Sequence, residues 1–389
     1  MTQFFTFFDN YLLLGILAFT AVAISWEDYR TKKIRNKWIA VAIACGIVVH
    51  LAAMLLYFVV FKNRGIEINF SYYGRIIVNT GISFVVSFVL WKTGIWSAGD
   101  GKLFIAFAFL LPLQYYSRGY TEFFPASALL INIFFTLFII TILHTIIVAI
   151  FKPASRISGQ EQKKTNIGAK LIGSFKENWE TFATMFILFT FIFSSATIIR
   201  KKLEIYGLSA LVNIVLLLMM FAIFKPLSEY MRKNFKKYAV LKYSVLTTIL
   251  VVMWILVRLE LTDFGQILRN AKTMAIFMIG VGSLLKAIDY LIEKTEVEKR
   301  SLKELEASEI ITEKCLKDIK SGKYKLDLGT TTMDGLTQEQ LWEIAEKYDE
   351  QQQFDTYKTL PFAPMASLGV LVTCVLKASI IHYALKNLF

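Results

Sequence analysis

The sequence is poor in charged residues, and it lacks the motifs of the common soluble enzymes. Only 19% of its 389 residues are charged and 56% are apolar, whereas a soluble domain carries about 25% charged residues. Its three cysteines and three histidines are far apart, and it has no CxxC, HExxH, GxSxG or Walker-type glycine loop. The composition excludes a soluble enzyme and a disordered chain, and the cysteine spacing indicates neither a zinc site nor a disulfide framework. We expect neither a metal nor a cofactor.

The apolar residues occur in long blocks of roughly 18–25 residues, the length of helix that crosses about 30 Å of hydrocarbon. We predict an all-α fold, a polytopic integral membrane bundle of about ten spans. The predicted spans are Tyr11–Trp26, Trp38–Phe61, Gly74–Trp96, Lys102–Leu113, Pro125–Phe151, Glu180–Ile199, Gly207–Phe224, Ala239–Val257, Ala271–Ile292 and Pro361–Leu385. The fourth is too short to cross alone before Pro112. We expect it either to continue past the proline or to be a half-helix shielded by its neighbours.

The formal net charge of +13 comes mainly from lysines and arginines in the loops between these blocks. One alternating set of loops holds about twice as many of them as the other, which places that set in the cytosol. We therefore expect a multi-pass protein of the cell membrane. No basic stripe interleaved with aromatic residues is present, so we expect no binding to nucleic acid.

Loop length and charge divide the chain into four parts. We predict a membrane core in residues 1–151, further spans in residues 152–292, a small cytosolic helical domain in residues 293–360 and a final span in residues 361–389. Thr337 stands three residues before Gln340, as in a capping box, with Leu336 and Leu341 placed to form a hydrophobic staple. Further apolar residues recur at near-helical spacing through about Gly322, namely Leu302, Leu305, Ile311, Leu316 and Ile319.

Two aspartates stand at the same predicted depth, at the cytosolic edge of the membrane. Asp28 directly follows the first span, and Asp100 lies between the third and fourth spans with Gly99 and Gly101 on either side. Because glycine has no side chain, another backbone segment can approach this turn closely. Either aspartate alone is most often a helix-end or interface residue, but two at one depth favour a dyad. Two carboxylates about 3 Å apart share one proton, so one can act as base and the other as acid.

Three stretches resemble the signatures of a known family. They are residues 28–36 (DYRTKKIRN), 97–103 (SAGDGKL) and 361–364 (PFAP). In the same order, they are similar to the Asp-x-Arg-x-x-x-Ile-x-Asn, Gly-x-Gly-Asp-x-Lys-Leu and Pro-Phe-x-Pro segments of the prepilin peptidases, the GxGD-type aspartic proteases of the membrane. Two positions depart from the family pattern. Ser97 replaces the first glycine, and Arg35 replaces the proline usually placed before the asparagine.

The resemblance implies a membrane-embedded aspartic endopeptidase in which Asp28 and Asp100 are catalytic, with roles that belong to the coupled pair. The supporting residues it implies are Gly99, Gly101, Lys102, Pro361 and Pro364. It also implies a substrate, a prepilin- or preflagellin-like precursor whose short basic leader is cut at the cytosolic face, just before an apolar helix. The lipid bilayer is the other expected partner. No segment resembles the family's four-cysteine zinc insert, so methyltransferase activity is not implied.

Two other functions remain open from the sequence. A ten-span transporter or channel could use Asp28 and Asp100 as ion or proton ligands, because acids inside membranes are usually functional. Against this interpretation, both acids lie at one membrane edge, whereas coupling sites usually lie near the midplane. A catalytically inactive relative of the family is the second alternative, which Ser97 keeps open.

Overall fold

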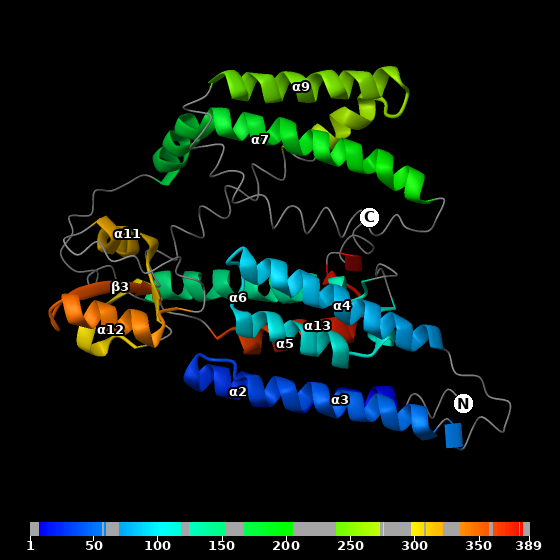
Figure 1. Ribbon diagram of the computed structural model, residues 1–389, viewed down its shortest axis with the longest axis vertical. Helices are drawn as coiled ribbons and strands as arrows, with labels where there is room; N and C mark the ends of the chain where they lie inside the picture. The colour runs from blue at the N-terminus through cyan, green and yellow to red at the C-terminus, as the bar shows by residue number, and fades with distance from the viewer. Residues whose placement is uncertain are drawn as a thin grey trace. The chain divides into compact units, whose positions relative to one another are not determined.

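The computed structural model describes residues 8–56, 58–59, 70–117, 124–151, 167–204, 239–272, 275, 297–306, 309–321, 335–357, 361–380 and 382–383. They are mostly helical (Figure 1). They belong to two compact units, one made of residues 1–146 and 296–389 and the other of residues 147–295.

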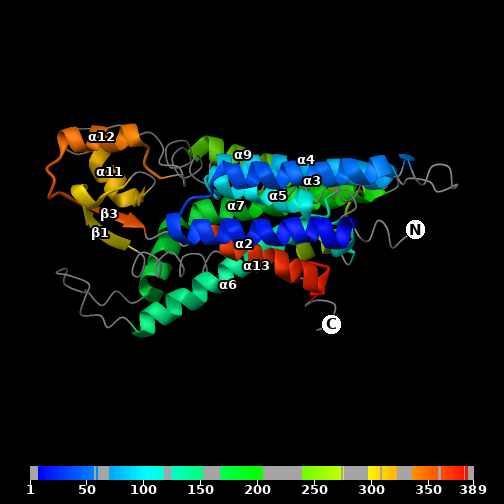
Figure 2. The same ribbon diagram turned by 90° about the horizontal axis from the view of Figure 1, so that it is seen from below.

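The described part of the first unit contains a bundle of apolar helices (Figure 2). These are η1 (Phe8–Leu13), which continues into α2 (Leu14–Thr31), then α3 (Asn36–Leu56), α4 (Phe70–Lys92), α5 (Ala98–Leu110), η4 (Leu113–Tyr116), α6 (Ser127–Phe151) and α13 (Phe362–Leu376). Helix α2 ends where Lys32 takes a left-handed conformation, with φ of 54°, and donates its N–H to the carbonyl of Asp28. The chain then turns directly into α3.

Helix α5 is short and lies at the centre of this bundle, where it contacts α2, α3, α4 and α13. Its 13 residues extend about 20 Å, less than the roughly 30 Å of a hydrocarbon core. It ends at Leu110 because Leu111 precedes Pro112 and is held in an extended conformation. Near this end, Asn79 of α4 donates a hydrogen bond to the Ala108 carbonyl. The fourth predicted span is therefore a half-helix shielded by its neighbours, one of the two expected forms.

Helix α13 is held in the bundle although it is far from the other helices in the sequence. The fully buried Asn132 of α6 donates to the hydroxyl of Thr373 and to the carbonyl of Ala378. Its side-chain oxygen accepts the N–H of Ile380 at 2.7 Å. Apolar surroundings offer no water to replace such bonds, so they favour one position of α13 against α6.

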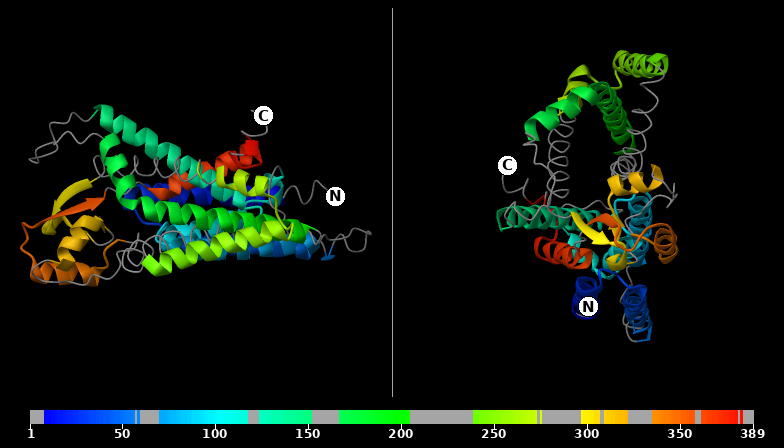
Figure 3. Two further views of the ribbon diagram at one scale, coloured as in Figure 1. Left: turned by 90° about the horizontal axis from the view of Figure 1, so that it is seen from above. Right: turned by 90° about the vertical axis from the view of Figure 1, so that its left-hand side faces the viewer.

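Residues 297–357 contain a small α+β fold with its own core. Its sheet has the order β1-β3-β2, with β1 (Val297–Ser301) and β2 (Ile310–Ile311) both antiparallel to β3 (Gln353–Tyr357). Helices α11 (Glu313–Ser321) and α12 (Gln338–Lys347) lie on one face of the sheet (Figures 2 and 3). The core consists of Leu302, Leu305, Ile311, Ile319, Leu336, Ile344 and Phe354.

The expectation of an all-helical domain here, and with it of a strictly all-α chain, is wrong. Leu302, Leu305 and Ile311 are indeed buried, but they lie in or beside strands and not on one helix. A spacing of three to six residues over a short stretch suits both a helix and a strand–turn–strand, and β3, which completes the sheet, follows more than 40 residues after β2. The capping box is confirmed, because the Thr337 hydroxyl accepts the N–H of Gln340 and the Gln340 side chain accepts that of Thr337.

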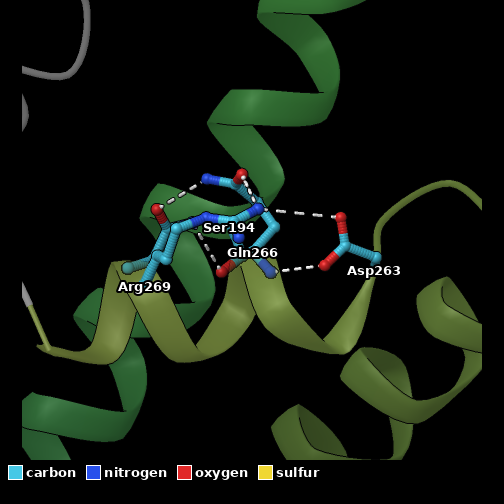
Figure 4. A network of polar contacts seen from close by, with 5 residues as sticks. Ser194, Asp263, Gln266 and Arg269 are labelled. Carbon is cyan, nitrogen blue, oxygen red and sulfur yellow. Dashed lines mark hydrogen bonds and ion pairs between the residues drawn. The ribbon is translucent and has the colours of Figure 1, made fainter.

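In the second unit, α7 (Ile167–Glu204) packs against α9 (Ala239–Arg258). A polar network joins α7 to the helical stretch 264–272 (Figure 4). Asn270 donates to the hydroxyl of Ser194 and accepts from Gln266. Gln266 in turn accepts from Arg269 and donates its backbone N–H to the carboxylate of Asp263.

Four helices in the described residues are long and apolar enough to cross a membrane: Tyr11–Thr31, Asn36–Leu56, Ser71–Lys92 and Ser127–His144. Ala183–Ile199, Tyr243–Arg258 and Phe362–Leu376 are apolar but shorter. The predicted span Gly207–Phe224 and most of Ala271–Ile292 lie outside the described residues. Ten spans and a cytosolic position for residues 293–360 therefore stay predictions.

Candidate active site

Asp28 lies in the last turn of α2, and its side chain faces the beginning of α13. The residue is only 4% exposed, and its Oδ2 accepts the backbone N–H of Ala363 at 2.8 Å. The first N–H groups of a helix have no partner within the helix, and a carboxylate is a favoured acceptor for them. Pro361 precedes the helix in an extended conformation, and Pro364 in its first turn has no N–H to satisfy. The Pro-Phe-x-Pro segment thus forms a helix start that receives Asp28.

Asp100 lies in the first turn of α5 and forms a reciprocal capping box with Ser97. The Ser97 hydroxyl accepts the N–H of Asp100 at 3.2 Å, and Oδ2 of Asp100 accepts the N–H of Ser97 at 3.0 Å. Serine is among the best N-cap residues, whereas glycine has no side chain with which to bond. The departure from the family's first glycine therefore has a local structural reason. The S-x-x-D pattern before an apolar run is the sequence signal of this capping box.

The two glycines beside Asp100 are positions of close approach. A Cβ atom at Gly99 would lie 3.2 Å from Cβ of Ile34, and one at Gly101 would lie 3.3 Å from Cβ of Ser87. Gly99 therefore lets the loop between α2 and α3 lie against the Asp100 turn, while Gly101 lets α4 pack on its other side. Both glycines thus allow close packing around the turn, and their part in an active site stays a prediction.

Lys102 joins the first motif to the second. Its Nζ donates to Oδ1 of Asn36 at 3.0 Å, so the asparagine of the first signature contacts the lysine of the second. The third motif contacts Trp96, the residue directly before the second motif, which is only 3% exposed. The ring centroid of Trp96 lies 5.6 Å from that of Phe362 and 5.3 Å from that of Phe134.

The structure thus brings all three sequence motifs together at one end of the bundle. Asp28 bonds to the third motif, Trp96 packs on Phe362, and Lys102 bonds to Asn36. Helices α2 and α5, which carry Asp28 and Asp100, contact each other. The first motif thus contacts both of the others, and the residue directly before the second motif packs on the third.

Glu27 and Arg35 form an ion pair that the sequence did not indicate. Nε of Arg35 lies 3.2 Å from Oε1 of Glu27, and Nζ of Lys37 lies 3.8 Å from the same oxygen. Arg35 stands where the family usually has proline. The residue that departs from the family pattern therefore forms an ion pair in this fold.

Aromatic and basic side chains together surround this end of the bundle. Cation–π contacts pair Arg30 with Trp26 at 4.4 Å, Lys32 with Tyr29 at 5.5 Å, Lys37 with Trp38 at 5.3 Å and Lys92 with Trp91 at 5.7 Å. Tryptophan and tyrosine are enriched at the level of lipid headgroups. Asp28 stands between Trp26 and Tyr29 along α2, and so it lies at the level of this aromatic and basic band. Within the described residues, no three His, Cys, Asp or Glu side chains are grouped as metal ligands would be.

Comparison with known families supports the resemblance seen in the sequence. Residues 15–150 match the type IV leader peptidase family. The matched stretch runs from α2 to α6 and contains both aspartates, whereas the Pro-Phe-x-Pro segment lies beyond it. Neither the curated proteins nor the solved structures give a significant match.

Proposed function

We propose that this chain, a prepilin peptidase family member through residues 15–150, is a membrane aspartic endopeptidase with Asp28 and Asp100 as its catalytic pair. Its substrate is a prepilin- or preflagellin-like precursor, which it cuts at the cytosolic face between a basic leader and an apolar helix. Membership of this family makes the chain a peptidase in general terms. The nature of the catalytic residues and of the substrate is the proposal.

The observation that carries it is the meeting of the three motifs. They are separated by as many as 335 residues in the sequence, as are Asp28 and Ala363. Yet the first motif contacts both of the others, and Trp96, directly before the second, packs on the third. A helix-capping role alone accounts for the bond between Asp28 and Ala363. It does not account for the placement of the Asp100 turn against the loop that follows Asp28.

The chemistry needs no group beyond the two carboxyls and a water molecule. The ionised carboxylate takes a proton from water as the water oxygen attacks the carbonyl carbon of the scissile peptide. The protonated carboxyl gives its proton to the carbonyl oxygen, and the roles reverse as the amine leaves. The N–H groups of Ala363 and Ser97 each bond one carboxylate oxygen, and these bonds hold the two side chains in fixed orientations.

The basic band supports the orientation. Basic residues beside spans are retained in the cytosol, and those around Asp28 and Asp100 belong to the loop set with the larger number of lysines and arginines. A precursor with a basic leader keeps that leader on the same side, so its cleavage point reaches the membrane edge where both aspartates lie.

Two isosteric substitutions test the proposal in membranes that contain a prepilin-like precursor. Asp28→Asn and Asp100→Asn each retain an oxygen that can accept the N–H of Ala363 or Ser97, but they cannot exchange the proton. We expect each to reduce cleavage by about 10²–10⁴-fold. Asp263→Asn is the matched control, because Asp263 also caps a helix through a backbone N–H but lies in the second unit.

Full processing by folded Asp28→Asn or Asp100→Asn protein would disprove the catalytic assignment. The transporter interpretation predicts ion- or proton-coupled flux through reconstituted wild-type protein and no cleavage, and the family match does not favour it. An inactive relative would give neither flux nor cleavage.

A further inference from the structure

A short loop connects α2 to α3 beside the Asp100 turn. It runs from Lys32 to Arg35, and the side chain of Glu27, one turn before the end of α2, reaches across it. Oε1 of Glu27 lies 3.2 Å from Nε of Arg35 and 3.8 Å from Nζ of Lys37. The Glu27 side chain is 14% exposed, compared with 56% for Arg35. The acidic partner of the pair is thus largely withdrawn from solvent, where screening is weak.

Helix stability does not explain this arrangement of charges. Acidic side chains are favoured at helix N-termini and basic ones at C-termini. Here an acid stands near the C-terminal end of α2, and two basic residues stand at the start of α3, whose first turn has no acid. The pair therefore opposes the preference of both helix ends, and its benefit must come from the position of the loop.

The loop lies directly on the turn that carries Asp100. Cβ of Ile34, the residue before Arg35, is 3.2 Å from the place where a Cβ of Gly99 would stand, and the Ile34 carbonyl is 3.7 Å from it. Immediately after the loop, Asn36 accepts a hydrogen bond from Lys102. A movement of Arg35 away from Glu27 would carry both neighbours with it and loosen the contact with residues 99–102.

We propose that Glu27 is a positioning residue for the cleavage reaction, and that its ion pair with Arg35 holds the loop between α2 and α3 against the Asp100 turn. The kinetic part of this inference rests on the proposed function. The pair acts through Ile34 and Asn36 and does not touch the scissile peptide. Glu27 thereby helps to set where Asp100 stands relative to Asp28.

The first experiment measures loop docking without using activity. Cysteines are introduced as Ile34→Cys and Gly99→Cys, with the three native cysteines replaced by alanine, and disulfide formation under mild oxidation is timed in membranes. The Cβ positions, 3.2 Å apart, need only a small adjustment to the 3.5–4.5 Å of a disulfide. Adding Glu27→Gln or Arg35→Gln should slow formation of the cross-link about fivefold. A fivefold change corresponds to about 1 kcal/mol, which is what a partly exposed ion pair contributes. Lys33→Gln removes an exposed positive charge from the same loop and should leave the rate unchanged.

The second experiment measures precursor cleavage in the chain with its natural Ile34 and Gly99. Glu27→Gln and Arg35→Gln should each lower kcat about fivefold with little change in KM, and the double variant should be no worse than either single one. The exchanged pair Glu27→Arg with Arg35→Glu should recover most of kcat, because it restores attraction and places each charge at its preferred helix end.

Cross-linking and kcat at wild-type values in both single variants would overturn the proposal. Additive losses without recovery in the exchanged pair would overturn it as well, because they indicate unrelated structural damage. Failure of the proposed function is seen separately. Wild-type protein would then cleave no precursor, while the cross-linking rates still decide whether Glu27 and Arg35 hold the loop.

Discussion

Asp28 has a structural role at the start of α13 that can be measured separately from catalysis. Its Oδ2 is the acceptor for the N–H of Ala363, in a site where the aspartate is only 4% exposed. Asp28→Ala removes that acceptor and leaves a backbone N–H buried without a partner, which costs about 1–3 kcal/mol. Asp28→Asn keeps an acceptor oxygen and loses only the additional strength of a charged partner. We therefore expect the alanine variant to be the less stable of the two.

The size of the effect is within reach of a thermal assay. For a domain of roughly 150–250 residues, 1 kcal/mol shifts Tm by about 2–4 °C. A loss of about 2 kcal/mol in Asp28→Ala then lowers the Tm of the detergent-solubilised protein by about 4–8 °C, and Asp28→Asn lowers it by less than half as much. Fluorescence-detected size exclusion after heating gives the Tm. Hydrogen exchange of the Ala363 N–H measures the local effect. This exchange should be faster than in the wild type only in the alanine variant.

A control at the same helix interface separates the lost acceptor from general loosening. Ser25 and Ser367 share a hydrogen bond of 3.0 Å between α2 and α13, and Ser367→Ala removes it without leaving a backbone group unpaired. It should cost no more than about 1 kcal/mol. If Asp28→Ala and Asp28→Asn have the same Tm and the same exchange at Ala363, the reasoning about the helix start is wrong.

Three further predictions follow from other contacts. Ser97→Ala should destabilise the start of α5 by about 1 kcal/mol and reduce cleavage, whereas Ser97→Gly should cost only a few tenths of a kcal/mol. Thermal unfolding and precursor processing of the two variants measure these effects. Gly369→Ala should lower Tm markedly, since the new Cβ would stand 2.7–2.9 Å from atoms of Ile133 that include its backbone, while Gly81→Ala, with nothing within 4 Å, should not. Burial raises the pKa of Glu309 above its ordinary 4.5, so its contribution to stability is present below pH 4.5 and is lost as the pH rises through the folded pKa. Glu309→Gln should therefore be at least as stable as the wild type at pH 7 by hydrogen exchange in residues 297–357, and a large loss there would contradict this.

The features of the candidate site that could be predicted from the sequence are those encoded by short motifs. Asp28, the Asp100 turn and Pro361-Phe362-Ala363-Pro364 were each recognisable because a few residues at fixed spacing determine a local geometry. The loop charges predicted that the first two lie at one membrane edge, and this stays a prediction. The contact of Asn36 with Lys102 shows that the two motifs lie next to each other. Whether these aspartates are the catalytic residues stays a prediction.

Other features depended on partners that spacing does not reveal. Glu27 and Arg35 are eight positions apart, on either side of a turn whose direction only the fold determines. The strands in residues 297–357 were missed because β3 pairs with β1 and β2 from more than 40 residues away. Glycines in apolar helices were equally ambiguous. Gly46 is tightly packed, with Leu110 and Phe109 2.7 Å from a Cβ placed there, whereas Gly81 faces open space.

The bond from Asp28 to Ala363 also sets an order of events during biosynthesis. The two residues are 335 positions apart, so both aspartates have left the ribosome long before the helix that receives Asp28 has been synthesised. Until α13 has been made, the nascent chain has both acids but no Pro-Phe-x-Pro segment to bond the first of them. The orientation of the Asp28 side chain is thus completed only late in the synthesis of the chain.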